Sequence, residues 1–187
     1  MKRLLAVAAV AIFAFTTTGI VSGSVSGAMA GERKKLERRV DDAITAFYEK
    51  SYTGKELAEK AKGMLVFPKV YKAGIGIGGE YGKGALRVGG QTVDYYSTTS
   101  GSIGFQLGGQ KRTQILLFMT DKALEGFRNS DGWEIGVDGS VALIDLGTGA
   151  DLDTNSIKDP IVGFVFGNEG LMYNLSLEGT KISRLDD

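Results

Sequence analysis

The chain has 187 residues and a balanced charge, with 22 Lys/Arg against 22 Asp/Glu, and it contains no cysteine and no histidine. Without these two residue types, disulfides, thiolate metal sites and the Ser-His-Asp and Cys-His catalytic arrangements are excluded. We therefore expect a protein that is not an enzyme and has no cofactor or metal ion, although lysine or carboxylate chemistry with a carboxylate-bound metal stays open.

The first 30 residues have the organisation of an export signal. Lys2 and Arg3 give a charged start, residues 4–15 are apolar, and Ala28, Met29 and Ala30 form the small-x-small pattern that signal peptidases cleave. This apolar run is too short to cross a bilayer, which takes about 20 residues. We expect cleavage after Ala30 and a periplasmic or otherwise exported protein of one domain, 31–187. Because residues 4–30 carry no charge, an uncleaved anchor stays open.

The remaining charge is unevenly distributed. Residues 31–72 hold eleven Lys/Arg against seven Asp/Glu, whereas residues 73–187 hold nine against fifteen. A basic front end on an acidic body indicates an anionic partner for the front end. The acidic body would repel a nucleic-acid backbone and no recognition motif is visible, so we expect no nucleic-acid partner.

Residues 31–62 are predicted to form a basic helical segment. Residues 32–50 show apolar side chains at helical spacing, and residues 53–56 match a capping box that predicts a second helix over 55–62, ending near Gly63. The first helix is strongly basic at its start. Its apolar stripe is Leu36, Val40, Ala43, Ile44 and Phe47, and its basic residues are Arg33, Lys34, Lys35, Arg38 and Arg39.

Residues 63–187 are predicted to form a β-rich body. Apolar residues alternate over 75–81, 103–107, 133–137 and 171–177, and continuous apolar runs at 115–119 and 161–166 indicate central strands. One further helix is expected over 121–128, capped by Thr120. The predicted class is α+β, with short N-terminal amphipathic helices packed on a largely antiparallel, glycine-rich sheet or barrel.

The stretch GIGIGGEYGKG at residues 74–84 contains the G-x-G-x-x-G spacing of a dinucleotide site. That motif needs a helix N-terminus to hold the pyrophosphate, whereas residues 79–95 have the composition of a β-hairpin. We expect no nucleotide here and interpret the stretch as the first strand and turn of the sheet, with glycines that permit close approach. The acidic loop 145–153 lacks the glycine and glutamate of a calcium loop and is interpreted as a polar turn.

Several separated motifs resemble the SYLF domain family: AKGMLVFP at 61–68, KAG at 72–74, GKGAL at 82–86, FRNSDGWE at 127–134 and GLMYNLSLEGTK at 170–181. The resemblance covers residues 55–185 and implies a non-enzymatic lipid-binding module. In eukaryotic members a basic amphipathic N-terminal helix binds phosphoinositides, and some members bundle actin. The export signal argues against actin for this chain. Asn174 stands where relatives often have glycine, which leaves the packing of that strand open.

Two interpretations of the basic helix stay open. In the first, it binds an anionic phospholipid surface as a peripheral module, its apolar stripe lying in the membrane interface. In the second, the stripe packs on the sheet and the basic turn is a solvated end. The resemblance favours lipid, with these candidate residues: Arg33, Lys34, Lys35, Arg38, Arg39, Lys62, Lys69 and Lys72. The alternative function is a structural or stress-related envelope protein that binds an unidentified protein through its sheet.

Overall fold

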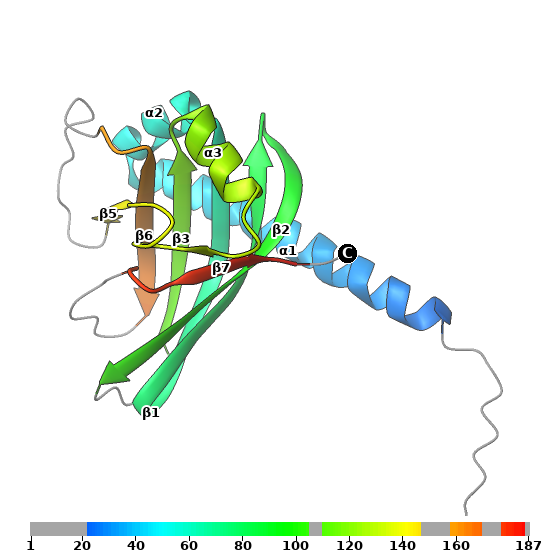
Figure 1. Ribbon diagram of the computed structural model, residues 1–187. Coiled ribbons are helices and arrows are strands. Elements are labelled where there is room, and N and C mark those ends of the chain that lie inside the picture. The colour runs from blue at the N-terminus through cyan, green and yellow to red at the C-terminus, as the bar shows by residue number, and fades with distance from the viewer. Residues whose placement is uncertain (1–21, 105–109, 147–157, 170–176, 186–187) are drawn as a thin grey trace, which may run out of the picture.

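The computed structural model describes residues 22–104, 110–146, 158–169 and 177–185. Within these residues, seven strands form one sheet, and three helices lie on its two faces (Figure 1). The helices are α1 (Ser22–Lys50), α2 (Tyr52–Lys60) and α3 (Asp121–Arg128). The strands are β1 (Gly63–Val88), β2 (Gln91–Gly104), β3 (Gln110–Phe118), β4 (Trp133–Glu134), β5 (Ala142–Asp145), β6 (Ile161–Glu169) and β7 (Lys181–Arg184).

The strand order in the sheet is β4-β7-β2-β1-β3-β6-β5. Every strand pair is antiparallel apart from β5 and β6, which run parallel. A tight turn at Gly89 and Gly90, with φ of 60° and 80°, joins β1 to β2. Glycine readily adopts such positive φ angles. Because this turn joins two antiparallel strands within residues 79–95, the hairpin expected there is confirmed. The predicted α+β class with a largely antiparallel sheet is confirmed as well.

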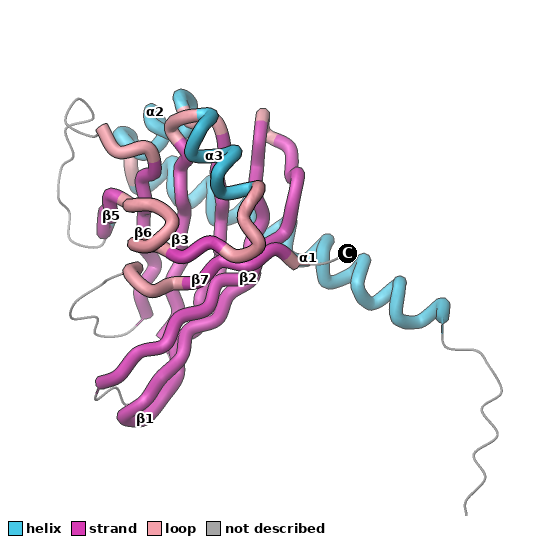
Figure 2. Tube along the Cα trace, viewed as in Figure 1, coloured by secondary structure: helices cyan, strands magenta, loops and turns pink. Residues whose placement is uncertain are grey.

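Strand β1 doubles back on itself near its middle. A Cβ built on Gly84 would lie 2.4 Å from the carbonyl oxygen of Val66, although a straight strand would separate these residues by about 60 Å at ~3.3 Å per residue. The two halves of β1 therefore lie side by side, and the sheet is a curled half-barrel of eight strand segments (Figure 2). Pro68 lies where the pairing with β3 shifts register, a position at which a strand tolerates the missing N–H.

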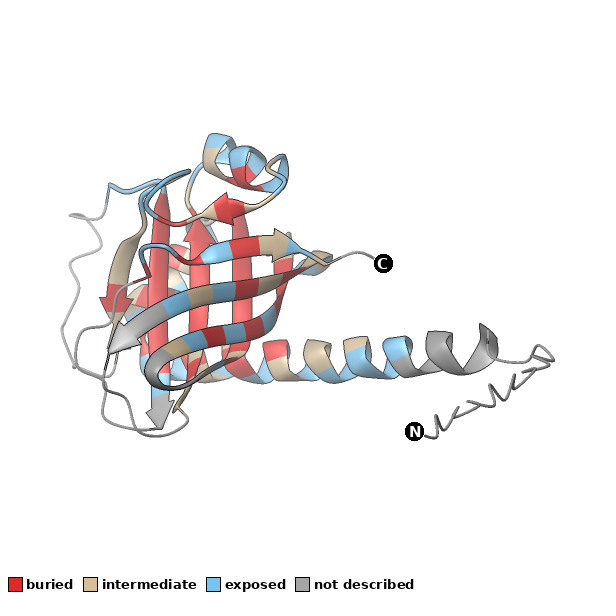
Figure 3. Ribbon diagram, turned by 60° about the horizontal axis from the view of Figure 1, so that its bottom comes forward, coloured by how far each residue is buried: buried red, intermediate tan, exposed pale blue. Residues whose placement is uncertain are grey.

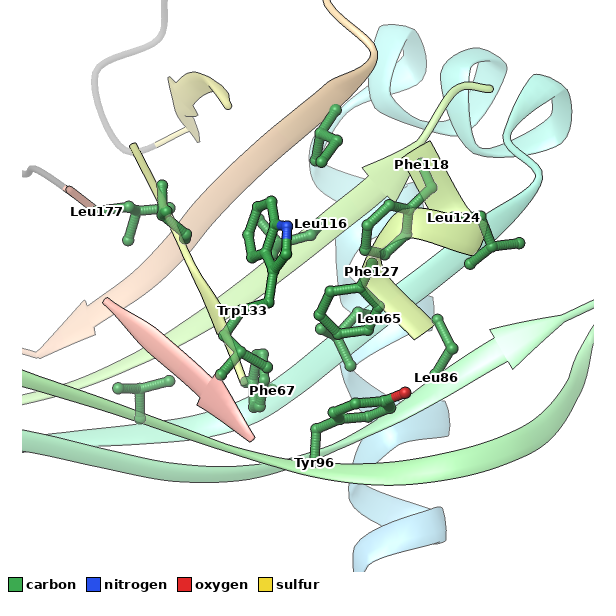
Figure 4. Close-up of a cluster of buried hydrophobic side chains, with 14 residues drawn as sticks. Leu65, Phe67, Leu86, Tyr96, Leu116, Phe118, Leu124, Phe127, Trp133 and Leu177 are labelled. Carbon is green, nitrogen blue, oxygen red and sulfur yellow. The ribbon is translucent and has the colours of Figure 1, made fainter. Parts of the chain in front are cut away.

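The curled sheet buries a hydrophobic cluster on each face. Helices α1 and α2 cover one face, where the Phe47 ring lies 4.8 Å from the ring of Phe164. Helix α3 and the β4 segment close the concave face, where Phe127 contacts Phe118, Tyr96 and Trp133 (Figure 4). The interior strands are buried along most of their length (Figure 3). This packing supplies the main stabilisation of both helical layers, since a fully buried large apolar side chain contributes about 1.5–3 kcal/mol.

The helix boundaries differ from the prediction at three points. Helix α1 begins at Ser22, ahead of the expected residue 32, and so continues through Ala30. The N-cap of α2 is Ser51, whose hydroxyl accepts a hydrogen bond from the Gly54 N–H at 2.9 Å, so the capping box at Thr53 is wrong. Helix α2 ends at Lys60 because the chain extends at Ala61, and Gly63 is already the first residue of β1. Helix α3 and its Thr120 cap are confirmed.

Two of the strand predictions are confirmed, one is wrong in part, and others lie outside the described residues. The runs at 115–119 and 161–166 fall in the interior strands β3 and β6, as expected. The strand over 133–137 is wrong beyond Glu134, because the backbone turns at Gly136, with φ of 91°, and leaves Val137 exposed. The alternating segment 171–177 lies outside the described residues except for Leu177, and most of 103–107 and of the 145–153 loop also lies outside them.

Candidate functional site

The apolar stripe of α1 is covered by the sheet. Val40 and Phe47 are fully buried, Ala43 is nearly so, and Leu36 and Ile44 pack partly buried against the same cluster. The interpretation in which this stripe lies in a membrane interface is therefore wrong, because its side chains already bury their surface against β1, β3 and β6. The second interpretation is confirmed for the stripe, and α1 presents its remaining faces to solvent (Figure 3).

A polar clamp fixes one edge of α1 to the sheet. The Arg87 guanidinium on β1 lies 2.8 Å from the Glu37 carboxylate and 2.7 Å from that of Asp41. Glu37 also accepts hydrogen bonds from the Tyr95 hydroxyl at 2.7 Å and the Thr92 hydroxyl at 3.0 Å. Burial, then the hydrogen bond from Tyr95 to Glu37, raises the pKa of the Tyr95 hydroxyl above its ordinary 10.0, so it remains a donor at neutral pH. The clamp holds the basic half of α1 at a fixed height above β1 and β2.

The same part of α1 borders a cavity of about 440 Å³ against the two halves of β1. We call this cavity the α1–β1 groove. Tyr71 and Tyr81, which stand 53% and 45% exposed, come from opposite halves of β1 and line its outer wall. Tyr95 lies on the α1 side, where the Arg33 guanidinium stands 5.2 Å from its ring centroid in a cation–π arrangement. The remaining apolar lining is Met29, Leu36, Pro68 and Leu185.

The rim of the α1–β1 groove is strongly cationic. Its charged lining consists of the acidic residue Glu32 and five basic residues: Arg33, Lys35, Arg39, Lys69 and Lys83. In the part of the chain that the structure describes, Lys35, Arg39, Lys69 and Lys83 have no acidic partner within salt-bridge distance. Gathered cations without counter-charges raise the local positive potential and favour an anionic ligand.

The predicted site residues divide into three groups. Arg33, Lys35 and Arg39 line the groove with Lys69, whereas Lys34 and Arg38 are exposed and do not line it. Lys62 lies apart, 3.7 Å from Asp121 at the start of α3. Lys72 is mostly buried and pairs with the Glu80 carboxylate at 3.4 Å, beside Arg112, which binds the same carboxylate. Lys62 and Lys72 therefore each lie near an acidic partner, and neither lines the groove.

Sequence reasoning missed Lys83 and the two groove tyrosines. In the sequence, Lys83 belongs to the glycine-rich stretch at 74–84, which has the spacing of a nucleotide site. In the structure it lies in strand β1, whereas a nucleotide site needs a helix N-terminus at this position. The doubling of β1 brings Lys83 to the same groove as Lys69, 14 positions earlier in the chain. No local sequence pattern signals this, because the contact depends on how β1 folds back. The alternation over 75–81 predicted Tyr81 on the buried apolar face of its strand, and this is wrong, because Tyr81 is exposed and its neighbour Glu80 is buried.

The chemistry available at the groove is that of binding. Its functional groups are ammonium and guanidinium donors, tyrosine hydroxyls and apolar surface. Across the described ranges no three Asp or Glu side chains gather in a way that would hold a metal ion. Within those same ranges, no helix is both long enough and apolar enough to cross a bilayer.

Residues 99–187 match the family described as Ysc84, Las17-binding protein actin regulator. This match covers the last six residues of β2 and the chain after them, so residues 99–187 carry a Ysc84/SYLF family domain, whereas α1, α2, β1 and the first part of β2 precede the matched region. The family is generally a non-catalytic binding domain associated with lipid and actin. A search of curated proteins found no match to this chain.

Proposed function

From the Ysc84/SYLF family domain at residues 99–187, we propose that the protein binds anionic phospholipid headgroups at a membrane surface. The binding face is the cationic rim of the α1–β1 groove together with the exposed Lys34 and Arg38 of α1. The observation that carries this proposal is a set of four rim cations that have no acidic partner among the described residues: Lys35, Arg39, Lys69 and Lys83.

The expected binding is mainly electrostatic. Each basic side chain near an anionic membrane contributes about 1 kcal/mol, and the contribution falls off within a Debye length. Because the apolar stripe of α1 is buried, the helix cannot add the hydrophobic insertion of an interfacial amphipathic helix. The acidic body, repelled by the same membrane, orients the basic face toward it.

We propose that the protein is exported and that this binding takes place outside the cytoplasm. Its support is the charged start, short apolar run and small-x-small pattern of residues 1–30. Cleavage after Ala30 would shorten α1 and remove Met29 from the groove while keeping every basic rim residue. Mass spectrometry of the protein purified from a cell-envelope fraction tests this: an N-terminus at Gly31 supports export with cleavage, and an intact N-terminus in the cytoplasmic fraction contradicts it.

Co-sedimentation with vesicles tests the lipid function. We expect binding to vesicles that contain anionic phospholipid, weak binding to neutral vesicles, and release as salt rises. Replacing Arg33, Lys34, Lys35, Arg38 and Arg39 by Gln is expected to abolish the difference between the two vesicle types. Equal binding of the unaltered protein to neutral and anionic vesicles would overturn the proposal and favour a protein partner.

A further inference from the structure

We propose that the α1–β1 groove takes one acyl chain of an anionic phospholipid, whose phosphate lies among the rim lysines. This inference rests on the proposed function, because it assigns a ligand to the same basic face. It goes further in one respect. In the proposed function the protein contacts headgroups at the membrane surface, whereas here it also holds one lipid molecule partly out of the bilayer, with an acyl chain inside the groove.

The volume and lining of the groove fit a chain better than a headgroup alone. Its 440 Å³ lies in the range of about 300–1,000 Å³ that small-molecule sites occupy. A site for a free phosphate would be small and lined by donors, whereas Leu36, Pro68, Tyr71, Tyr81 and Leu185 contribute apolar surface here. A lining that combines apolar side chains with cations makes the cavity amphipathic, and a lipid has both an apolar and an anionic part.

The apolar walls come from three separate parts of the chain, which makes the groove a consequence of the fold. Leu36 belongs to α1, Tyr71 and Tyr81 to the two halves of β1, and Leu185 follows β7. The doubling of β1 sets the distance between the tyrosines, and the Glu37–Arg87 clamp holds α1 over them. The walls therefore exist without a ligand, and preformed walls reduce the entropic cost of holding a chain.

The charges on the rim decide which lipids are accepted. Lys69 and Lys83 come from the two halves of β1, and Lys35 and Arg39 come from α1, so both elements contribute cations to the groove lining. These cations lack acidic partners in the described chain, so an entering phosphate does not have to displace a protein carboxylate. A neutral or zwitterionic headgroup would leave the rim charge uncompensated, and we expect it to bind less tightly.

The test separates chain uptake from surface binding by using monomeric ligands. Protein purified from cells expressing the full chain is titrated with lysophosphatidylglycerol below its critical micelle concentration, with lysophosphatidylcholine and with glycerol phosphate. Isothermal titration and native mass spectrometry are expected to show one lysophosphatidylglycerol per protein, with binding at least tenfold weaker for the other two ligands. Glycerol phosphate binding as tightly as lysophosphatidylglycerol would overturn the inference, since the chain would then contribute nothing.

A matched variant keeps the two proposals distinguishable. In Tyr71→Ser/Tyr81→Ser both walls lose their rings while every charge remains, and both positions are exposed enough for the fold to tolerate the change. We expect at least a tenfold loss of lysophosphatidylglycerol affinity, with co-sedimentation on anionic vesicles kept within about threefold. Unchanged lysophosphatidylglycerol binding in this variant would overturn the groove assignment. Failure of the unaltered protein to prefer anionic vesicles would instead overturn the proposed function.

Discussion

Gly84 and Val66 lie against each other in the folded chain, so closely that a Cβ on Gly84 would stand 2.4 Å from the Val66 carbonyl oxygen. The two residues meet because β1 folds back on itself, and the proposed binding face depends on this fold of the strand. It places Lys69 and Lys83 on one groove and Tyr71 opposite Tyr81. The glycine-rich stretch thus allows the two halves of β1 to pack closely. The basic face forms because the folded-back strand brings its lysines to one groove.

Gly84→Ala is expected to destabilise the protein by about 1–3 kcal/mol, the usual range for overpacking a tightly packed interior. The new methyl group would also meet the Phe67 ring at 2.5 Å. Urea unfolding followed by the fluorescence of Trp133, the single tryptophan, measures the change. The control is Gly101→Ala, since a Cβ there has no neighbour within 4 Å among the described residues. Equal stability of the two variants would contradict the close packing of the two halves of β1.

Glu80→Gln is expected to cost about 3–5 kcal/mol, because it leaves a buried cation without its counter-charge. The Glu80 carboxylate binds Arg112 through hydrogen bonds of 3.3 and 2.5 Å, and both side chains are at least 93% buried. Burial lowers the pKa of Arg112 and the Glu80 carboxylate opposes that shift. Asp121→Asn is the control: it breaks an exposed pair with Lys62, and chemical denaturation should show a loss below about 1 kcal/mol.

Ser51→Ala is expected to lower stability by about 1 kcal/mol through loss of the α2 N-cap. Its hydroxyl is the acceptor for the Gly54 N–H, and Ser51 is buried. Thr53→Ala, at the position that the sequence pattern suggested as the cap, should cost less, since Thr53 lies inside the helix. Thermal unfolding of the two single variants decides between them. A larger loss for Thr53→Ala would contradict the assigned cap.

Stability is expected to fall as pH rises above 10, and Tyr95 contributes to this fall. Burial first, then the hydrogen bond to Glu37, raises its pKa above the ordinary 10.0. A raised pKa means that the folded state holds the proton more tightly, so this stabilisation is present below pH 10 and is lost as pH rises through the folded-state value. Tyr95→Phe should therefore show a shallower loss of the unfolding free energy above pH 10. Identical slopes would contradict the role of this hydroxyl.

Elements with a strong local signal were predictable from the sequence. Helix α3, with Thr120 as cap, and the interior strands β3 and β6 follow from periodicity and apolar runs alone. The cap at Ser51 was missed because Thr53 and Glu56 match a capping box, whereas in the folded chain the Ser51 hydroxyl accepts the hydrogen bond from the Gly54 N–H and the helix begins at Tyr52. The strand at 133–137 failed because Gly136 adopts a positive φ, which the alternating pattern does not reveal.

The candidate site was predictable only in part, for a physical reason. Arg33, Lys35 and Arg39 stand close together in one basic segment, so the sequence shows them as a cluster. Lys83 joins them through the doubling of β1, a long-range contact without a local pattern. Lys62 and Lys72 lie close in sequence to that region, but Asp121 and Glu80 engage them in ion pairs that only the folded chain reveals.

The most direct measurement compares two charge-matched double variants by co-sedimentation with anionic vesicles. Lys69→Gln/Lys83→Gln removes two groove cations, and Lys62→Gln/Lys122→Gln removes two positive charges elsewhere, at residues that do not line the groove. At about 1 kcal/mol for each lysine at the membrane, the groove variant should lose at least tenfold in vesicle affinity, while the control stays within about threefold. Equal losses in both variants would show that only net charge matters and would contradict binding at the α1–β1 groove.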